Sequence, residues 1–218
     1  MSAKVNPERR RYQSPRRQQQ AAETRRQILR AAQRLFEEQG YALTSMAAIA
    51  AEADVALKTV YLAFDTKSGL MRGLWDTLLR GEPDIAVAQQ PWYLEMLNEA
   101  DPVRQLQLDA RNSTAVKKRV GNLLRVLRDG AASDPEVDAL WQLINTDFYA
   151  NQLEVVRSLH RKKALQRGLD VNRATDILWT LIHPDVWHLL VGARGWTPER
   201  YEKWLADTTC AQLLRPTT

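Results

Sequence analysis

Apolar residues recur along this chain every three or four positions, which is the period of an amphipathic α-helix. The chain has only 9 Gly and 9 Pro in 218 residues and few runs of β-branched residues, so the pattern predicts an all-α protein. A first long helix starts between Pro15 and Thr24, where two cap signals lie, and Gly40 ends it. Its expected buried stripe is Ile28, Ala32, Leu35 and Phe36.

Two short helices separated by a tight turn are predicted between residues 42 and 70. The first follows Thr44 and Ser45, whose hydroxyls suit a helix N-cap. The second runs roughly from Leu57 to Phe64, and Asp54 lies in the turn, where aspartate tolerates the backbone angles. Two short helices in this arrangement form a helix-turn-helix, which places its second helix in the major groove of double-stranded DNA.

The second of these helices has a face that can read DNA. Val60 and Phe64 are four residues apart and point inward together, which leaves the other side chains available for bases and phosphates. The alternative is a small packing unit with a solvated lysine and a half-buried tyrosine. For DNA contacts we expect Leu57, Lys58 and Thr59 on bases, and Thr44, Ser45, Tyr61 and Lys67 on the phosphate backbone.

The same stretch carries a family resemblance. The run from Arg25 to about Leu79 resembles the DNA-binding domain of the tetracycline-repressor (TetR) family of transcriptional regulators, most densely at TSMAAIA, TVY, Phe64 and Lys67. Asp54 stands where the family usually has glycine in the turn, and Ala56 stands where it often has a serine that caps the recognition helix. The resemblance implies an N-terminal three-helix DNA-binding domain followed by a C-terminal helical bundle that binds a ligand and dimerises.

The second half of the chain also predicts helices, about five in number. The expected elements are a mixed connector over residues 85–97, one or two helices from Pro102 through Arg128, a long helix from Pro135 that reaches as far as Leu165, a helix capped by Asn172 that runs through Ile182, a helix from Pro184 to about Ala193, and a last helix from Pro198 to about Leu214. The predicted domains are therefore a disordered basic arm (1–20), the DNA-binding domain (21–80) and the helical effector and dimerisation domain (81–218).

Aromatic residues in the second half are candidates for a ligand site. A cavity between bundle helices is the usual place for a small organic molecule. The simpler interpretation is that these rings only fill the core, although the resemblance favours a ligand because many family members release DNA when one binds. The candidate effector-binding residues are Trp92, Tyr93, Trp141, Phe148 and Tyr149.

The last helices are candidates for a dimer interface. By resemblance, the final two helices pair across a two-fold axis as a four-helix interface, and their apolar residues exceed what one packing seam needs. A two-fold dimer implies a palindromic operator. The expected interface residues are Trp179, Ile182, Trp187, Leu190 and Trp204.

The net charge of +5 is unevenly distributed along the chain. Residues 1–20 hold six basic residues against Glu8, whereas basic and acidic residues cancel in the remainder. A basic arm next to a DNA-binding unit can follow phosphates or a minor groove. A solvated leader is the equally weighted alternative.

Several classes of function lack the residues they require. No stretch approaches the roughly 18 apolar residues of a membrane span, and the single cysteine, Cys210, fits a reducing cytoplasm. His160, His183 and His188 lack the i, i+3 or i, i+4 spacing of a helical metal site, so we expect no metal and no cofactor. No nucleophile motif or paired carboxylates indicate an enzyme.

Three hypotheses follow from the sequence. The first is a cytoplasmic, homodimeric, ligand-responsive repressor that binds a palindromic operator. The second is a non-specific DNA-binding accessory protein that relies on the basic arm, with a steep salt dependence. The third is a helical small-molecule-binding protein with a vestigial DNA-binding domain.

Overall fold

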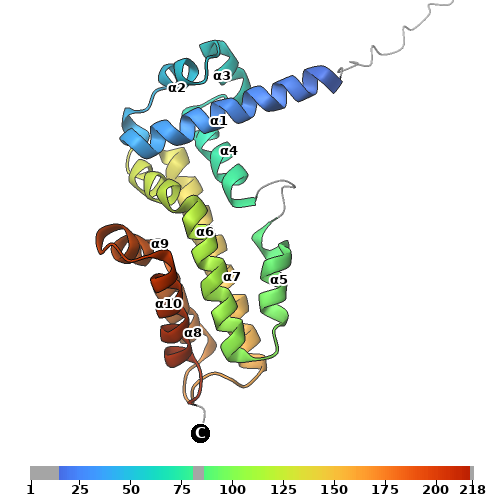
Figure 1. Ribbon diagram of the computed structural model, residues 1–218, viewed down its shortest axis with the longest axis vertical. Coiled ribbons are helices and arrows are strands. Elements are labelled where there is room, and N and C mark those ends of the chain that lie inside the picture. Colours follow the sequence, from blue (N-terminus) through green and yellow to red (C-terminus); the bar gives the residue numbers. More distant parts are fainter. Residues whose placement is uncertain (1–14, 81–85, 217–218) are drawn as a thin grey trace, which may run out of the picture.

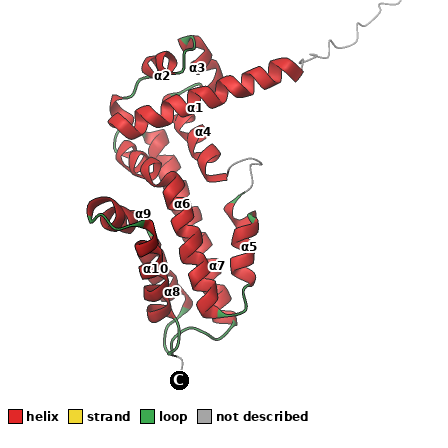
Figure 2. Cartoon of the chain, in the orientation of Figure 1, coloured by secondary structure: helices red, strands yellow, loops and turns green. Residues whose placement is uncertain are grey.

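The computed structural model describes residues 15–80 and 86–216, and within these ranges every regular element is a helix (Figures 1 and 2). The predicted all-α class is confirmed. The helices are α1 (Pro15–Leu43), α2 (Met46–Glu52), α3 (Leu57–Phe64), α4 (Lys67–Arg80), the 3-10 turn η1 (Val87–Gln89), α5 (Pro91–Asn98), α6 (Pro102–Ala131), α7 (Pro135–Arg161), α8 (Val171–Ile182), α9 (Pro184–Trp187), the π-helix η2 (His188–Ala193) and α10 (Pro198–Leu213).

Two long antiparallel helices, α6 and α7, form the axis of the molecule (Figure 1). Helices α1–α4 gather at one end of this axis, α5 lies along one side, and α8 and α10 lie along the other side (Figure 1). Helix α6 contacts α1, α4, α5, α7 and α10, so it joins the N-terminal helices to the rest of the protein.

The largest core continues from the N-terminal helices into α6 and α7. Ile28 and Phe36 of the predicted α1 stripe are completely buried there, together with Val60 of α3. The same apolar cluster includes Leu127 of α6 and Val137 of α7. The apolar core is thus continuous across the boundary at residue 80, where α4 ends.

Most of the predicted helix starts are confirmed. The carboxylates of Asp101 and Asp134 accept backbone N–H groups at the starts of α6 and α7, and the Thr197 hydroxyl does the same for α10. Each of these caps satisfies an amide that has no partner inside its helix. Helix α3 spans Leu57–Phe64, as the pattern predicts.

Four boundaries differ from the prediction. Helix α8 is capped by Asp170, whose Oδ1 accepts the amide of Arg173 at 2.9 Å, and not by Asn172. Helix α7 ends at Arg161, and the expected connector contains η1 and α5. Helix α1 begins at Pro15, so residues 15–20 of the expected arm are helical. The remainder of the arm, residues 1–14, lies outside the described residues.

Candidate DNA-binding surface and effector cavity

The helix-turn-helix is held on α1 by both polar and apolar contacts. The Arg25 guanidinium donates to the carbonyl of Ala63 at 2.7 Å and lies 4.1 Å from the centre of the Phe64 ring. Arg34 of α1 forms an ion pair with Glu52 at the end of α2. These contacts fix α2 and α3 relative to α1, beyond what the buried face of each short helix provides.

The caps within this unit follow from its sequence. The Ser45 hydroxyl accepts the amide of Ala48 at 3.0 Å and caps α2, as predicted. Asp54 has a φ of 53°, in the left-handed region where glycine is favoured. Ala56 occupies the N-cap of α3 with extended backbone but provides no side-chain hydrogen bond. Both positions at which the chain departs from the resembling pattern are therefore less favourable than glycine and serine would be.

The outward face of α3 lies opposite Val60 and Phe64. Lys58 is exposed, Leu57 and Tyr61 are about half exposed, and Thr59 is partly buried. Leu62 is 79% exposed on the same face as Lys58, four residues earlier. We did not include Leu62 among the expected contacts, although its position on the helix opposite Val60 was sufficient to find it.

Thr44 is not available to a DNA phosphate, which corrects our prediction. It is 1% exposed, and its hydroxyl donates to the carbonyl of Gly40 at 2.8 Å and to that of Leu35 at 3.2 Å. Gly40 has a φ of 82° and breaks the α1 helix geometry, so nearby carbonyls need other donors. The Thr44 hydroxyl therefore supplies a hydrogen-bond donor to carbonyls near the end of α1.

Lys67 also has partners within the protein, and the phosphate contact that we predicted for it stays a prediction. Its Nζ donates to the carbonyls of Tyr41 and Thr44 at 2.9 and 3.0 Å and lies 4.1 Å from the centre of the Tyr41 ring. Burial lowers the pKa of this ammonium group. The side chain thus joins the start of α4 to the end of α1.

A polar junction links this end of the N-terminal helices to the α6–α7 turn. The Tyr41 hydroxyl donates to the Asp134 carboxylate, and the Ser68 hydroxyl donates to Glu136 at the start of α7. The hydrogen bond from Tyr41 is the main reason that the pKa of Asp134 is lowered. Gly130 packs so tightly on Tyr41 that an added Cβ would lie 3.0 Å from two atoms of that side chain.

A cavity of about 350 Å³ lies among α4, α5, α6 and α7 and is closed at one side by Ile182 and Pro184. Four of the five predicted effector residues line it, namely Trp92, Tyr93, Trp141 and Phe148. Tyr149 does not, because its hydroxyl donates to Asp176 Oδ1 at 3.0 Å and its ring packs against Trp179. One residue further along α7 turns a side chain by about 100° away from the cavity.

Polar residues that we did not predict also line this cavity. Asp109 and Lys117 of α6 and Gln152 of α7 are each more than nine-tenths buried. Burial raises the pKa of Asp109 and lowers the pKa of Lys117, and each of the two charges partly offsets the shift of the other. In a helical-wheel projection of α6, Asp109 and Lys117 fall near the apolar face of the helix. Only the packing of four helices shows that both residues line one cavity.

The predicted dimer residues divide into two groups. Ile182 lines the cavity, and Trp187 packs edge-on against Tyr201 with ring centres 4.9 Å apart, so both are buried within one subunit. These two predictions are wrong, because two short helices must also cover α6. Trp179, Leu190 and Trp204 are half-buried and retain some surface.

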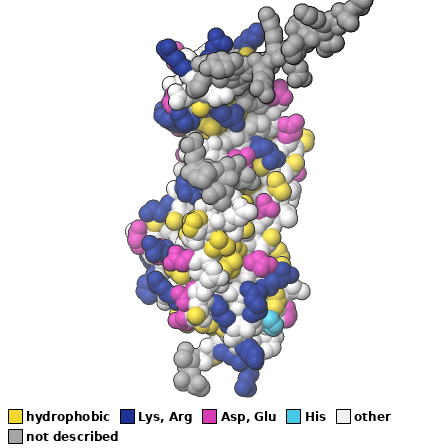
Figure 3. All heavy atoms as spheres, turned by 90° about the vertical axis from the view of Figure 1, so that its right-hand side faces the viewer, with side chains coloured by type: hydrophobic (Ala, Val, Ile, Leu, Met, Phe, Trp, Pro, Cys, Tyr) yellow, Lys and Arg dark blue, Asp and Glu magenta, His cyan; other side chains and the backbone are white. Residues whose placement is uncertain are grey.

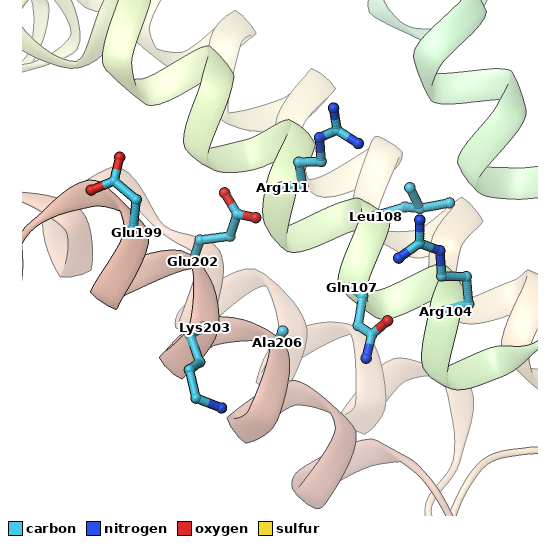
Figure 4. A pocket seen from close by; sticks show the side chains of 8 residues that line it. All are labelled: Arg104, Gln107, Leu108, Arg111, Glu199, Glu202, Lys203 and Ala206. Atoms are coloured by element: carbon cyan, nitrogen blue, oxygen red, sulfur yellow. The ribbon is translucent and has the colours of Figure 1, made fainter.

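A second, more open hollow lies on the surface of the described residues. A second hollow of about 300 Å³ between α6 and α10 is lined by Arg104, Arg111, Glu199, Glu202 and Lys203, with charges of both signs facing water (Figure 4). Figure 3 shows Lys and Arg side chains on the end that carries α1–α3, and hydrophobic side chains along the middle of that face. No group of three potential metal ligands occurs among the described residues, and no helix described is long and apolar enough to span a membrane.

Comparison with known proteins identifies the family. Residues 28–74 match the model of the "Bacterial regulatory proteins, tetR family". Over 170 residues the chain is 33% identical to the "Probable HTH-type transcriptional regulator ArpR" of Pseudomonas putida. The aligned region covers 75% of this chain and 79% of ArpR. This chain belongs to the TetR family. It is accordingly a DNA-binding transcriptional regulator and not an enzyme.

Solved structures share the fold of this TetR-family regulator. NalD, the secondary repressor of the MexAB-OprM multidrug efflux pump in Pseudomonas aeruginosa, superposes with a TM-score of 0.71 at 23% identity and covers 91% of this chain and 100% of its own. SmeT, solved as a complex with triclosan, superposes with a TM-score of 0.69 at 20% identity, over 88% of this chain and 92% of its own. At these identities the likeness concerns the fold.

Proposed function

We propose that this TetR-family regulator is a ligand-responsive repressor that acts in the cytoplasm and binds a palindromic operator as a homodimer. The observation that supports this proposal best is the outward face of α3, where Lys58, Tyr61 and Leu62 are exposed beside the capped start of α2. A short helix with an exposed lysine, hydroxyl and apolar side chain can offer hydrogen bonds to base edges and a contact to a thymine methyl group. Residues 21–80 form the proposed DNA-binding domain, and residues 81–218 form the proposed effector and dimerisation domain.

Among the predicted DNA contacts, the structure favours those with free side chains. Lys58 and Leu57 at the start of α3 are proposed to meet bases, with Leu62 added to them, and Tyr61 is proposed to meet a phosphate. Ser45 keeps a role through the amides at the start of α2, where an anion is favoured. Thr59 is partly buried and is the weakest of these candidates.

We infer that the dimer interface uses the outer sides of α8 and α10. Trp179 of α8, Leu190 of η2 and Trp204 of α10 are half-buried within the subunit, and Leu189 of η2 is 62% exposed. Large exposed apolar side chains next to each other commonly mark a protein interface. A two-fold dimer of this kind would present two copies of α3 to successive major grooves.

The cavity supports an effector site, and α4 connects it to the DNA-binding helices. Trp75 and Leu79 of α4 line the cavity, while Lys67 and Ser68 at the start of the same helix contact α1 and α7. A ligand that binds better when α4 is displaced would shift the population toward subunits whose α3 helices no longer match the operator spacing. The triclosan in the SmeT structure is a precedent from another protein of this fold.

The test is selection from a random DNA duplex library by the purified full-length protein. An inverted repeat among the retained duplexes would support the dimeric repressor, and the operator so found would be used to measure affinity. We expect Tyr61→Ala to weaken binding to all sequences and Lys58→Ala to change the preferred sequence. Arg167→Ala, at an exposed position between α7 and α8, removes the same charge as Lys58→Ala and should change neither affinity nor preference.

Two other outcomes would favour the alternatives. Retention without a consensus that disappears when residues 1–14 are deleted would favour a non-specific accessory protein that depends on its basic arm. If no duplex were retained even at low salt, a small-molecule-binding protein with a vestigial DNA-binding domain would be the better description.

A further inference from the structure

Several hydrogen-bond donors of the cavity have partners within the protein. The Lys117 ammonium donates to Ser113, and the Tyr93 hydroxyl donates to the carbonyl of Asn151 at 2.9 Å. The Asn112 and Asn145 side-chain amides donate to the carbonyls of Trp92 and Trp141, at 3.2 and 2.9 Å. All of these groups line the cavity, so each of them already has a partner within the protein before a ligand binds.

The acceptors of the cavity are not used in the same way. Within the described residues, Gln152 Oε1 is buried and has no hydrogen-bond partner, although Gln152 is only 5% exposed. The Asp109 carboxylate, 7% exposed, has neither a hydrogen bond nor an ion pair within 4.0 Å among those residues. Buried acceptors without donors are costly, and a ligand that supplies donors recovers that cost.

The positive charge nearest to Asp109 does not neutralise it by direct contact. Lys117 lies eight residues further along α6, donates to Ser113 and lies 5.7 Å from the centre of the Tyr201 ring. Its charge lowers the pKa of Asp109, but desolvation is the larger effect and raises it. A cation placed against this carboxylate would therefore meet a buried acidic group that has no hydrogen bond or ion pair within the protein.

Aromatic rings make up much of the remaining wall. Trp75, Trp92, Trp141 and Phe148 line the cavity along with Tyr93. Rings of this kind pack against apolar ligands and also attract a cation over their faces.

We propose that the effector of this cavity is an aromatic, apolar molecule that carries a protonated amine. Its ring system packs among the tryptophans, and its N–H groups donate to the Asp109 carboxylate and to Gln152 Oε1. This inference rests on the proposed function, in which the cavity is the effector site. An anionic ligand would instead leave both acceptors unsatisfied and would place its charge beside the Asp109 carboxylate.

Calorimetric titration of the full-length protein at pH 7 with three probes that share one ring tests this inference. The probes are 2-naphthylmethylamine, 2-naphthylmethanol and 2-naphthoate, which place an ammonium, a hydroxyl or a carboxylate on the same naphthalene. We expect the amine to bind about tenfold more tightly than the alcohol, since a hydrogen bond to a charged group exceeds a neutral one. Equal affinities, tighter binding of the carboxylate, or no binding of any probe would overturn the proposal.

Three variants assign the selectivity to its residues. Asp109→Asn keeps the shape but removes the charge, and should abolish the advantage of the amine while the alcohol binds as before. Gln152→Leu should weaken the amine several-fold. Asp147→Asn removes a carboxylate on the exposed rim of the cavity and should leave amine affinity within about twofold. If Asp109→Asn retained the preference for the amine, the assignment of this carboxylate would be wrong.

The titration contains no DNA, so its result is separate from the proposed repressor function. A preference for the amine without release of selected operator DNA would support the ligand class and contradict the effector role. Release of operator DNA by the naphthoate alone would support the repressor function and contradict the inferred ligand class.

Discussion

Replacing Lys67 by methionine separates a structural role from a DNA contact. The variant keeps the apolar stem of the side chain but removes two hydrogen bonds, at 2.9 and 3.0 Å, to the carbonyls of Tyr41 and Thr44, and a cation 4.1 Å from the Tyr41 ring. Hydrogen bonds to charged groups contribute about 1.5–3 kcal/mol each, and a cation over a ring about 0.5–1 kcal/mol. Two effects reduce the expected loss to about 2 kcal/mol. The ammonium group is partly desolvated in the native protein, and the Tyr41 carbonyl keeps the hydrogen bond that the Thr44 amide donates at 3.3 Å.

Thermal and urea unfolding followed by circular dichroism would measure this loss. For a chain of this size, about 2 kcal/mol corresponds to a decrease in Tm of roughly 4–8 °C. Both proteins must be compared at one concentration, because the proposed dimer would make Tm concentration-dependent. Lys58→Met is the matched control, since Lys58 is exposed and should leave the unfolding midpoint unchanged. An unchanged midpoint for Lys67→Met, together with equally weakened binding to all DNA sequences, would refute the structural role and restore the phosphate contact.

Three further predictions concern stability. Ala56→Ser should stabilise the protein by about 1 kcal/mol in urea unfolding, because the extended N-cap of α3 lacks a side-chain acceptor. Ala51→Ser, at an exposed position inside α2, should not stabilise it. Gly130→Ala should destabilise the protein by about 1–3 kcal/mol, because the new Cβ would lie 3.0 Å from Tyr41. Gly192→Ala is the control, since no atom lies within 4 Å of its new Cβ, and it should not destabilise the protein. Equal losses of stability in the two variants would argue against the clash. The pKa of Asp109 is raised from 3.8 to about 7, so its contribution to stability is present below pH 3.8 and is lost as the pH rises to about 7. The pKa of Lys117 is lowered from 10.5 to about 7, so its contribution to stability is present above pH 10.5 and is lost as the pH falls to about 7. The double variant Asp109→Leu, Lys117→Met should therefore gain about 1–4 kcal/mol near pH 7 and have a flatter stability profile between pH 4 and 10, and a loss of stability at pH 7 would contradict this.

The amino-acid sequence determined the local elements of this protein. Caps are local, because an Asp or Thr accepts amides two or three residues further along the chain, and this is why the starts at Asp101, Asp134 and Thr197 were predicted. The helix-turn-helix was equally accessible, since its apolar spacing and its turn lie within 30 residues. The same logic failed at Asp170, because two cap residues two positions apart, Asp170 and Asn172, offered alternative starts for α8.

The tertiary structure decided which side chains are exposed, which line the cavity and which are buried in the core. Thr44 and Lys67 read as DNA contacts in sequence, but their partners are the carbonyls at the end of α1, which depend on how Gly40 bends that helix. The sequence predicted Ile182 and Trp187 as interface residues of the last helices, but in the structure both are buried, and Trp187 packs against Gly121 of α6.

The cavity depends on tertiary structure most of all. Its walls come from helices that are far apart in sequence, and a periodicity of 3.6 residues tells which side of a helix is apolar but not which helix lies against it. Asp109 and Gln152 belong to α6 and α7, 43 positions apart, and each by itself reads as an isolated polar residue on an apolar face. Only the packing of those faces placed both acceptors in one desolvated space, and desolvation is what makes the two acceptors selective for a donor.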